Sequence, residues 1–277
     1  GSEMCIRDSP ITDTWSHYTR YGSSSNSLSH TSILSLHKDM QGNIWVGTYY
    51  GGVNVFNPDK NNHSFYCAEP LREDCLSFPV VGKMTEDSAG NVWICTEGGG
   101  LNCYHGDTGV FSRYMYQKGD QSTLGSNNVK SVFYRKENNR LYAGTHLGGL
   151  FVLDLKSNKG HTLHHVTGDP ASLPHEIVND IQEYKDGIAM LTQGGPVFFD
   201  PVTEKFSPLT DDPSVQKLIS REYAFETFLI DSRHRMWFAV GGGGIVCVNL
   251  SSSKVTQYLA DSEKDTLTVG RYKTVHI

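Results

Sequence analysis

A seven-residue pattern returns at nearly constant spacing along the chain, and this repeat constrains the fold more than any other feature. The pattern GNIWVGT at residues 42–48 recurs as GNVWICT at 90–96 and as NRLYAGT at 139–145. Weaker copies lie at 187–192 and 235–240. The aligned positions 45, 93, 142, 189 and 237 are 48, 49, 47 and 48 residues apart. A fixed period of this length is typical of supersecondary units that stack on one another.

Each repeat has the same internal order of strands and turns. An apolar stretch such as residues 33–36 precedes a polar turn, and the pattern strand follows. A glycine pair then lets the chain reverse with positive φ. A third strand ends at turn residues such as Asn57, and a fourth, more polar strand carries an aromatic residue. Four short antiparallel strands per repeat are typical of β-propeller blades.

The sequence therefore predicts an all-β fold, a β-propeller of five four-stranded repeats with less than about 5% helix. The blades are expected near residues 31–66, 79–114, 128–166, 176–209 and 223–258.

The two ends of the sequence do not form complete blades. Residues 15–21 read as the fourth strand of a preceding blade, and residues 266–277 as the inner strand of a following one. Residues 1–11 match no repeat, and we interpret them as a non-native or disordered leader. Because a seven-bladed ring at this period needs roughly 340 residues, we expect residues 12–277 to form an incomplete part of a larger propeller.

Charge excludes one class of partner. The chain has 24 basic and 30 acidic residues, a net charge of −6, and no basic run longer than a pair. Proteins that bind the phosphate backbone need a basic patch or stripe. We therefore expect no nucleic-acid partner.

The repeats resemble the two-component regulator propeller family, whose blades read roughly D-x-x-G-N-I-W-x-G-T-x-x-G-G-L. The first blade carries this pattern from Asp39 to Gly52 and the second from Asp87 to Leu101. The resemblance implies the periplasmic sensor domain of a hybrid histidine kinase held in the inner membrane. It also implies an oligosaccharide or other small ligand, and as further partners the remaining blades and the kinase of the parent chain.

Loops after the pattern strands and loops before the inner strands are expected at one common edge of the blades, where propellers usually bind ligands. Tyrosine offers an apolar face with a hydroxyl, while amides, carboxylates and arginine form forked hydrogen bonds. Such an inventory suits a sugar, although each residue taken alone also fits an ordinary exposed loop. The candidate ligand-binding residues are Tyr49, Tyr50, Glu97, Asn128, His146, His175 and Arg221. At the opposite edge the turns carry mostly Asp, Asn, Lys and Gly, and we expect no apolar surface for a sugar there.

The recurrent tryptophans are expected to be structural. Trp45, Trp93 and Trp237 hold a fixed place inside the second strand, which favours packing between blades over a carbohydrate platform. The aspartates of the preceding turns, such as Asp39, are expected to cap backbone N–H groups.

No catalytic motif or cofactor site is expected, so the fragment is predicted not to be an enzyme. His161, His164 and His165 form a cluster, but zinc needs three or four ligands in fixed geometry. We interpret the cluster as part of a solvated outer strand and predict no metal site.

The cysteines fall into two groups. Cys95, Cys103 and Cys247 occupy apolar strand positions and are expected to be buried thiols. Cys67 and Cys75 share one loop between blades and are a candidate disulfide in an oxidising compartment. A bond there would stabilise the fold by roughly 2–3 kcal/mol in the chain-entropy account.

Two functions compete with ligand sensing. The blade pattern also resembles streptogramin-cleaving propeller lyases, for which His146, His175 and Glu97 are the candidate triplet. A third possibility is a scaffold that binds no ligand and mediates homodimer contacts.

Overall fold

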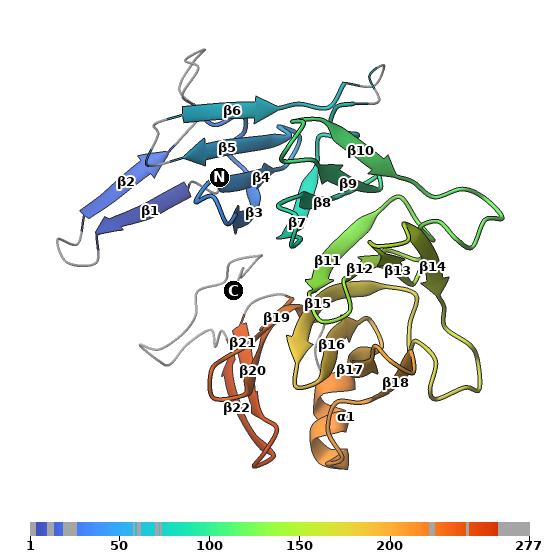
Figure 1. Cartoon of the computed structure of the whole chain (residues 1–277). Coiled ribbons are helices and arrows are strands. Elements are labelled where there is room, and N and C mark those ends of the chain that lie inside the picture. The colour runs from blue at the N-terminus through green and yellow to red at the C-terminus, as the bar shows by residue number, and fades with distance from the viewer. Residues whose placement is uncertain are drawn as a thin grey trace. The chain divides into compact units, whose positions relative to one another are not determined.

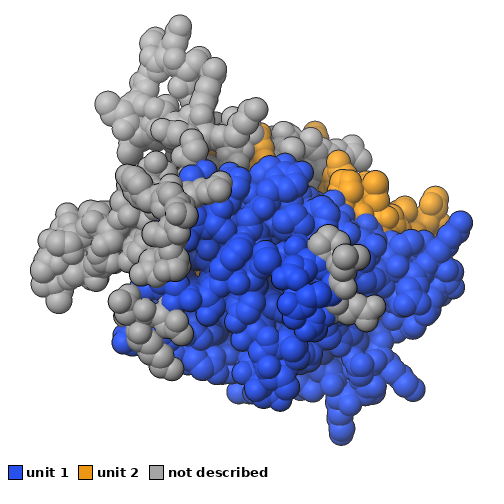
Figure 2. All heavy atoms as spheres, turned by 90° about the horizontal axis from the view of Figure 1, so that it is seen from above, with its two compact units in different colours: residues 1–143, 152–161 blue, residues 144–151, 162–277 orange. Residues whose placement is uncertain are grey.

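The computed structural model describes residues 4–9, 14–18, 27–57, 59, 62–69, 72, 74–221, 225–241 and 244–259. Of these, only the backbone is described for residues 4–9, 14–18, 62, 218, 220, 221 and 259. The chain divides into two compact units, which are coloured separately in Figure 2. Unit 1 comprises residues 1–143 and 152–161, and unit 2 comprises residues 144–151 and 162–277.

Five four-stranded antiparallel sheets follow one another along the chain, each a propeller blade with its strands in sequence order (Figure 1). Blade 1 contains β3 (Ile33–Lys38), β4 (Ile44–Thr48), β5 (Val53–Asn57) and β6 (Asn62–Tyr66). Blade 2 contains β7 (Val81–Glu86), β8 (Val92–Thr96), β9 (Leu101–Tyr104) and β10 (Phe111–Tyr114). Blade 3 contains β11 (Val129–Arg135), β12 (Arg140–Thr145), β13 (Leu150–Asp154) and β14 (Lys159–Leu163).

Blades 4 and 5 lie in unit 2. Blade 4 contains β15 (Val178–Tyr184), β16 (Gly187–Thr192), β17 (Gly195–Asp200) and β18 (Lys205–Pro208). Blade 5 contains β19 (Phe225–Ile230), β20 (Arg235–Val240), β21 (Gly244–Asn249) and β22 (Lys254–Leu259). The all-β, five-bladed prediction is confirmed.

Two strands and one helix of the described residues lie outside this pattern. Strand β1 (Met4–Ser9) pairs with β2 (Thr14–Tyr18) in a separate two-stranded sheet. The expected leader therefore includes residues with strand structure, and its non-native origin stays a prediction. The expected fourth strand at 15–21 is described only to Tyr18, and the expected strand at 266–277 lies outside the described residues.

Helix α1 (Pro213–Arg221) precedes blade 5 and was not expected from the sequence. Asp212 caps it, since its Oδ1 accepts hydrogen bonds from the backbone N–H groups of Ser214 at 2.9 Å and Val215 at 3.4 Å. Proline suits the first helical position because its missing N–H would have no partner there. Val215 and Ile219 bury the apolar side of the helix. In the described part of the chain, no helix has both the length and the apolar character needed to cross a bilayer.

A buried aspartate–tryptophan pair closes one edge of blades 1 and 2. The Trp45 indole Nε1–H donates to Asp39 Oδ2 at 2.8 Å, and Trp93 donates likewise to Asp87 at 2.9 Å. The other carboxylate oxygen of each aspartate accepts the backbone N–H at the end of the turn, that of Asn43 at 2.7 Å in blade 1. Both tryptophans are almost fully buried, so their predicted packing role and the capping role of the aspartates are confirmed.

Threonine and glycine form the opposite edge of each of blades 1 to 3. The Thr48 hydroxyl at the end of β4 donates to Gly52 O at 2.8 Å, and Thr96 and Thr145 repeat this bond to Gly100 and Gly149. These three glycines have φ between +70° and +74°. A Cβ at Gly52 would lie 2.3 Å from Tyr66 O, so a side chain cannot be placed there.

The same glycines link each blade to the chain segment that enters the next. Gly52 N–H donates to Pro79 O at 2.9 Å, Gly100 N–H to Asn127 O at 2.8 Å and Gly149 N–H to Glu176 O at 2.9 Å. The turn after each pattern strand therefore meets the loop before the following inner strand at one edge. This contact is the reason why the two predicted sets of loops share an edge.

Apolar residues fill the space between neighbouring blades within each unit. In unit 1, Trp45 and Val55 of blade 1 pack with Val81, Val92 and Phe111 of blade 2. In unit 2, blades 4 and 5 enclose a core that also contains Val215 and Ile219 of α1. Cys95, Cys103 and Cys247 are buried and form no disulfide, as predicted.

The loops that connect blades repeat as well, and one of them has a thiol where the others have a hydroxyl. Thr123 Oγ1 accepts the Gln117 N–H at 3.1 Å and donates to Asp120 O at 2.9 Å. Ser172 makes the corresponding bonds, accepting the Val166 N–H at 3.0 Å and donating to Asp169 O at 2.8 Å.

Cys75 holds this position in the first loop, because Ala68 and Leu76 form the same parallel bridge as Tyr116 and Leu124. Cys67 and Cys75, which directly precede the bridged residues, therefore lie at neighbouring positions and are both free thiols.

The disulfide thus remains a prediction, now with a physical reason. A thiol is a weak donor and cannot replace the hydroxyl bridge, whereas a covalent bond can. After export to an oxidising compartment, we expect a linked Cys67–Cys75 peptide in non-reducing mass spectrometry. Cys75→Ser should restore the bridge seen at Ser172 and fold without the bond. Recovery of both thiols free from exported protein would refute the pairing.

The Asp87–Trp93 pair gives a stability prediction. Trp93→Phe keeps most of the ring but removes the indole donor, and should lower the free energy of unfolding by about 1–2 kcal/mol. Trp93→Ala also removes packing, and should lower it by about 3–5 kcal/mol. Urea unfolding of both variants measures the two contributions. Equal stabilities of Trp93→Phe and the wild type would show that the hydrogen bond does not contribute.

Candidate functional site

Two exposed tyrosines follow β4 at the edge where blade 1 meets blade 2. Tyr49 and Tyr50 are 42% and 61% exposed, and their rings meet edge to face with centroids 4.6 Å apart. His30 approaches Tyr49 from the loop before β3, with ring centroids 6.5 Å apart. The pair thus presents aromatic surface and two hydroxyls to solvent.

Tyr50 is held in a backbone conformation that favours glycine. Its φ is +67°, and Gly98 occupies the same turn position in blade 2 with φ +130°. In blade 3 this position is Leu147, with φ +61° and 65% exposure. Bulky residues in this region are strained by about 1–3 kcal/mol, and such strain collects at functional sites. An exposed aromatic ring buries little surface that could offset this strain. Packing therefore does not explain why a tyrosine occupies this position.

Polar groups from blades 2 and 3 lie beside the tyrosines. Glu97 follows β8, and its Oε1 accepts a hydrogen bond from Lys130 Nζ of β11 at 2.8 Å. Both side chains are about one third exposed. The charge of Tyr50 contributes most to the raised pKa of Tyr49, and the Glu97 carboxylate contributes as well. The two loops also meet through the backbone, since Glu97 N–H donates to Val80 O at 3.1 Å and Gly52 N–H donates to the neighbouring Pro79 O at 2.9 Å.

Asn128 completes this part of the edge. It forms an isolated antiparallel bridge with Glu97, and its backbone N–H donates to Ser126 Oγ at 3.2 Å. The side-chain Oδ1 is buried and has no hydrogen-bond partner among the described residues. Buried acceptors without a protein partner are rare, and ordered water often satisfies them.

Four of the seven predicted residues are thus brought together in unit 1, namely Tyr49, Tyr50, Glu97 and Asn128. We call these four residues with His30 and Lys130 the tyrosine edge. Lys130 was missed by the sequence reasoning, which searched loops only. The sequence did contain a signal for Lys130. It follows Val129 at the start of an inner strand, opposite an acidic loop of the repeat.

The other three predicted residues belong to unit 2. His146 follows β12 and is partly exposed, and His175 Nδ1 accepts the backbone N–H of Ile177 at 3.1 Å. Arg221 is the last residue of α1 rather than a loop residue, because the helix continues to that point, and its side chain is outside the description. The structure does not assign these residues to the tyrosine edge.

The histidine cluster is occupied by hydrogen bonds within the chain. His164 Nδ1 lies 3.1 Å from Glu176 Oε2, and the backbone N–H of His165 donates to Glu176 Oε1 at 2.8 Å. Across the described residues, no group of three or more His, Cys, Asp or Glu side chains is arranged to hold a metal ion.

Comparison with known proteins agrees with the repeat. Residues 27–50, which include Asp39, Trp45 and both tyrosines, match the family described as "Two component regulator propeller". No curated protein sequence matches the chain.

Two similar solved structures are extracellular domains of hybrid two component systems from B. thetaiotaomicron. The first has a TM-score of 0.70 and 22% identity, over 94% of this chain and 32% of that chain. The second has a TM-score of 0.66 and 20% identity, over 96% of this chain and 34% of that chain. The chain thus spans about a third of the length of these structures. The predicted resemblance to two-component regulator propellers is confirmed.

A propeller enzyme is also similar in fold. A catalytically inactive virginiamycin B lyase from Staphylococcus aureus with quinupristin has a TM-score of 0.59 and 11% identity, over 84% of this chain and 71% of that chain. At this identity the likeness concerns the fold alone. Of the residues considered for a lyase, Glu97 lies in unit 1 and the two histidines lie in unit 2.

Proposed function

We propose that this chain is an extracytoplasmic ligand-sensing module of a hybrid two-component regulator, located in the periplasm. It binds an oligosaccharide at the tyrosine edge and signals to a histidine kinase elsewhere in the parent chain, without catalysing a reaction itself. The observation that carries this proposal is the exposed Tyr49–Tyr50 pair, with Tyr50 in a strained conformation, beside the Glu97–Lys130 ion pair.

The chemistry of the tyrosine edge matches the two kinds of surface that a sugar offers. Tyrosine rings pack against the C–H face of a pyranose, and they lose little conformational entropy in doing so. Hydroxyl groups of the sugar donate to Glu97 and accept from Lys130. These groups come from blades 1 and 2 and from the entry to blade 3, all within unit 1, which suits an extended ligand more than a single ring.

A place in a signalling protein is supported by the comparisons. The similar structures are extracellular domains of hybrid two component systems, each about three times as long as this chain. In our proposal the remaining blades belong to the rest of such a domain, and the kinase lies beyond the membrane. A ligand that bridges loops of several blades changes their relative freedom, which is a physical basis for signalling.

The strained position of Tyr50 allows function to be separated from stability. Tyr50→Gly removes the ring but relieves the positive φ, so its free energy of unfolding should stay within about 1 kcal/mol of wild type. Loss of the aromatic contact should weaken oligosaccharide binding by about 1–3 kcal/mol. Leu147→Gly is the matched control, with the same backbone change and no effect on binding.

Calorimetric titration with a panel of oligosaccharides, together with thermal melting, provides the measurement. Weaker binding by Tyr50→Gly at unchanged melting temperature supports the proposal. Equal binding by Tyr50→Gly and wild type removes the tyrosine edge as the site. If no oligosaccharide binds and the chain self-associates with increasing concentration, the dimerisation scaffold is the better account.

A further inference from the structure

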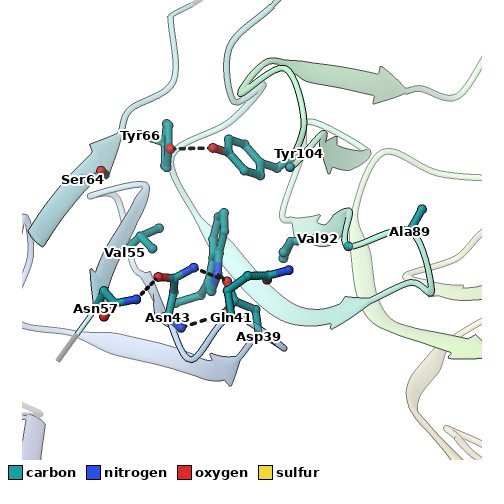
Figure 3. A pocket seen from close by; sticks show the side chains of 13 residues that line it. Asp39, Gln41, Asn43, Val55, Asn57, Ser64, Tyr66, Ala89, Val92 and Tyr104 are labelled. Atoms are coloured by element: carbon teal, nitrogen blue, oxygen red, sulfur yellow. Dashed lines mark hydrogen bonds between the residues drawn. The ribbon is translucent and has the colours of Figure 1, made fainter. Parts of the chain in front are cut away.

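A hollow lies between blades 1 and 2, at the edge opposite Tyr49 and Tyr50. It has a volume of about 290 Å³ and is lined by the β3–β4 and β7–β8 turns and by residues of β5, β6 and β9 (Figure 3). Trp45 lies near the start of β4 next to this hollow, whereas Tyr49 follows the end of the same strand. We call this hollow the inter-blade cleft.

Tyrosines line one side of the inter-blade cleft, contrary to the expectation that this edge has no apolar surface. Tyr66 of β6 stacks on the buried Trp45 at 6.1 Å and 11°, and Tyr104 of β9 meets Trp45 at 5.1 Å. Both tyrosines are half-buried. The Tyr66 hydroxyl donates to the Tyr104 hydroxyl at 3.0 Å, as Figure 3 shows. The Tyr104 O–H hydrogen has no acceptor among the described residues.

The other side is a fixed chain of amides. Asn57 Nδ2 donates to Asn43 Oδ1 at 2.6 Å, and Asn43 Nδ2 donates to Asp39 Oδ2 at 2.7 Å. Asp39 also accepts the Trp45 indole, so each amide orientation is set by its neighbour. Figure 3 shows Gln41 beside this chain, and its exposed side chain makes no hydrogen bond within the described part of the protein.

Glycine residues keep the inter-blade cleft open. A Cβ at Gly90 would meet only Gln41 Nε2 at 3.6 Å and Glu86 Oε1 at 3.8 Å, and Gly106 approaches the Gly90 carbonyl. One repeat later the same positions hold Asn139 and Leu155, and Leu153 replaces Tyr104. The open, hydroxyl-lined form is therefore a property of this pair of blades and not of the repeat as such.

Charge and unmet hydrogen bonding limit what fits the inter-blade cleft. Glu86 Oε2 accepts the Met40 N–H at 2.7 Å, while Oε1 is buried without a partner among the described residues. Burial raises the pKa of Glu86. Of the Asp39 and Glu86 carboxylates only that of Asp39 belongs to the lining, and the lining contains no cation. An anionic sugar would therefore be repelled, whereas neutral hydroxyl groups can bond to Gln41 and Tyr104.

We infer that the inter-blade cleft is a second binding site, which takes one neutral pyranose. Ligand sites range from about 300 to 1,000 Å³, so a cleft of about 290 Å³ suits a single ring. The C–H face of the ring packs on Tyr66 and Tyr104, and its hydroxyls bond to Gln41 and Tyr104. This site is independent of the tyrosine edge and holds whether or not that edge binds an oligosaccharide.

The repeat supplies a substitution that closes the inter-blade cleft without a new fold. Gly90→Asn copies Asn139, which adopts φ +51° at the same position of blade 3. Its side chain would extend toward Gln41 and occupy the cleft. Gly42→Asn is the matched control, because Gly42 has φ +84° in the corresponding turn of blade 1 and a Cβ added there would have nothing within 4 Å. Both variants bear the same backbone change.

Titration with methyl glucoside, methyl galactoside and methyl mannoside, followed by the Trp45 indole NMR signal, tests the inference. We expect at least one of them to bind saturably, at least tenfold more weakly to Gly90→Asn and equally to Gly42→Asn. Tyr104→Phe keeps the packing and should weaken binding roughly three- to tenfold, the effect of one lost hydrogen bond.

Three results would overturn the inference. The first is that no methyl hexoside binds. The second is that glucuronate or choline binds in place of the methyl hexosides. The third is that Gly90→Asn and Tyr104→Phe both bind with wild-type affinity. Tyr50→Gly should bind the hexoside like the wild type. That variant separates failure of the inter-blade cleft from failure of the tyrosine edge.

Discussion

The geometry of blades 1 and 2 depends on a buried, charge-assisted hydrogen bond. In each blade the tryptophan indole, that of Trp45 or Trp93, donates to the carboxylate of the aspartate in the preceding turn. The aspartate lies six residues before the tryptophan, so the bond closes the turn between the first two strands. Its remaining oxygen binds the turn backbone, which leaves no lone carboxylate in the core. Because removing one partner leaves the other buried and unsatisfied, the two residues have to be retained together.

Blade 5 repeats the bond between Trp237 and Asp231 at 2.9 Å. Blade 3 differs, since the Asn138 amide donates to the Tyr142 hydroxyl at 2.8 Å.

This bond at one edge and the threonine–glycine contact at the other fix both ends of the second strand. The inter-blade cleft depends on the first edge, since Asp39 orients Asn43 and through it Asn57. The tyrosine edge depends on the second, since Thr48 and Gly52 hold the turn that carries Tyr50 in its strained conformation. Each proposed site is thus a set of variable side chains on turns that the repeat makes rigid. Function can change from blade to blade without a change in the hydrogen bonds that define the blade.

The repeat made most of the fold predictable, because the pattern residues report directly on turns and buried strands. Helix α1 was missed although Asp212 followed by Pro213 is an ordinary helix start. The repeat had assigned that stretch to a connection between blades. Part of the tyrosine edge was also predictable, since Tyr49, Tyr50, Glu97 and Asn128 flank strands at known repeat positions. The inter-blade cleft was not, because Tyr66 and Tyr104 come from outer strands of different blades and meet only through packing. The sequence signal for the inter-blade cleft was the glycine at positions 90 and 106, where the next repeat has larger residues.

Hydrogen exchange of the indole Nε1–H groups, followed by NMR, tests the central claim most directly. The account predicts slow exchange at Trp45 and Trp93, because each indole is buried and bonded to a carboxylate. It also predicts that Asp87→Ala accelerates exchange at Trp93 while leaving Trp45 protected, since each pair belongs to its own turn. Exchange of both indoles at the rate of a free tryptophan, or unchanged protection of Trp93 in Asp87→Ala, would contradict it.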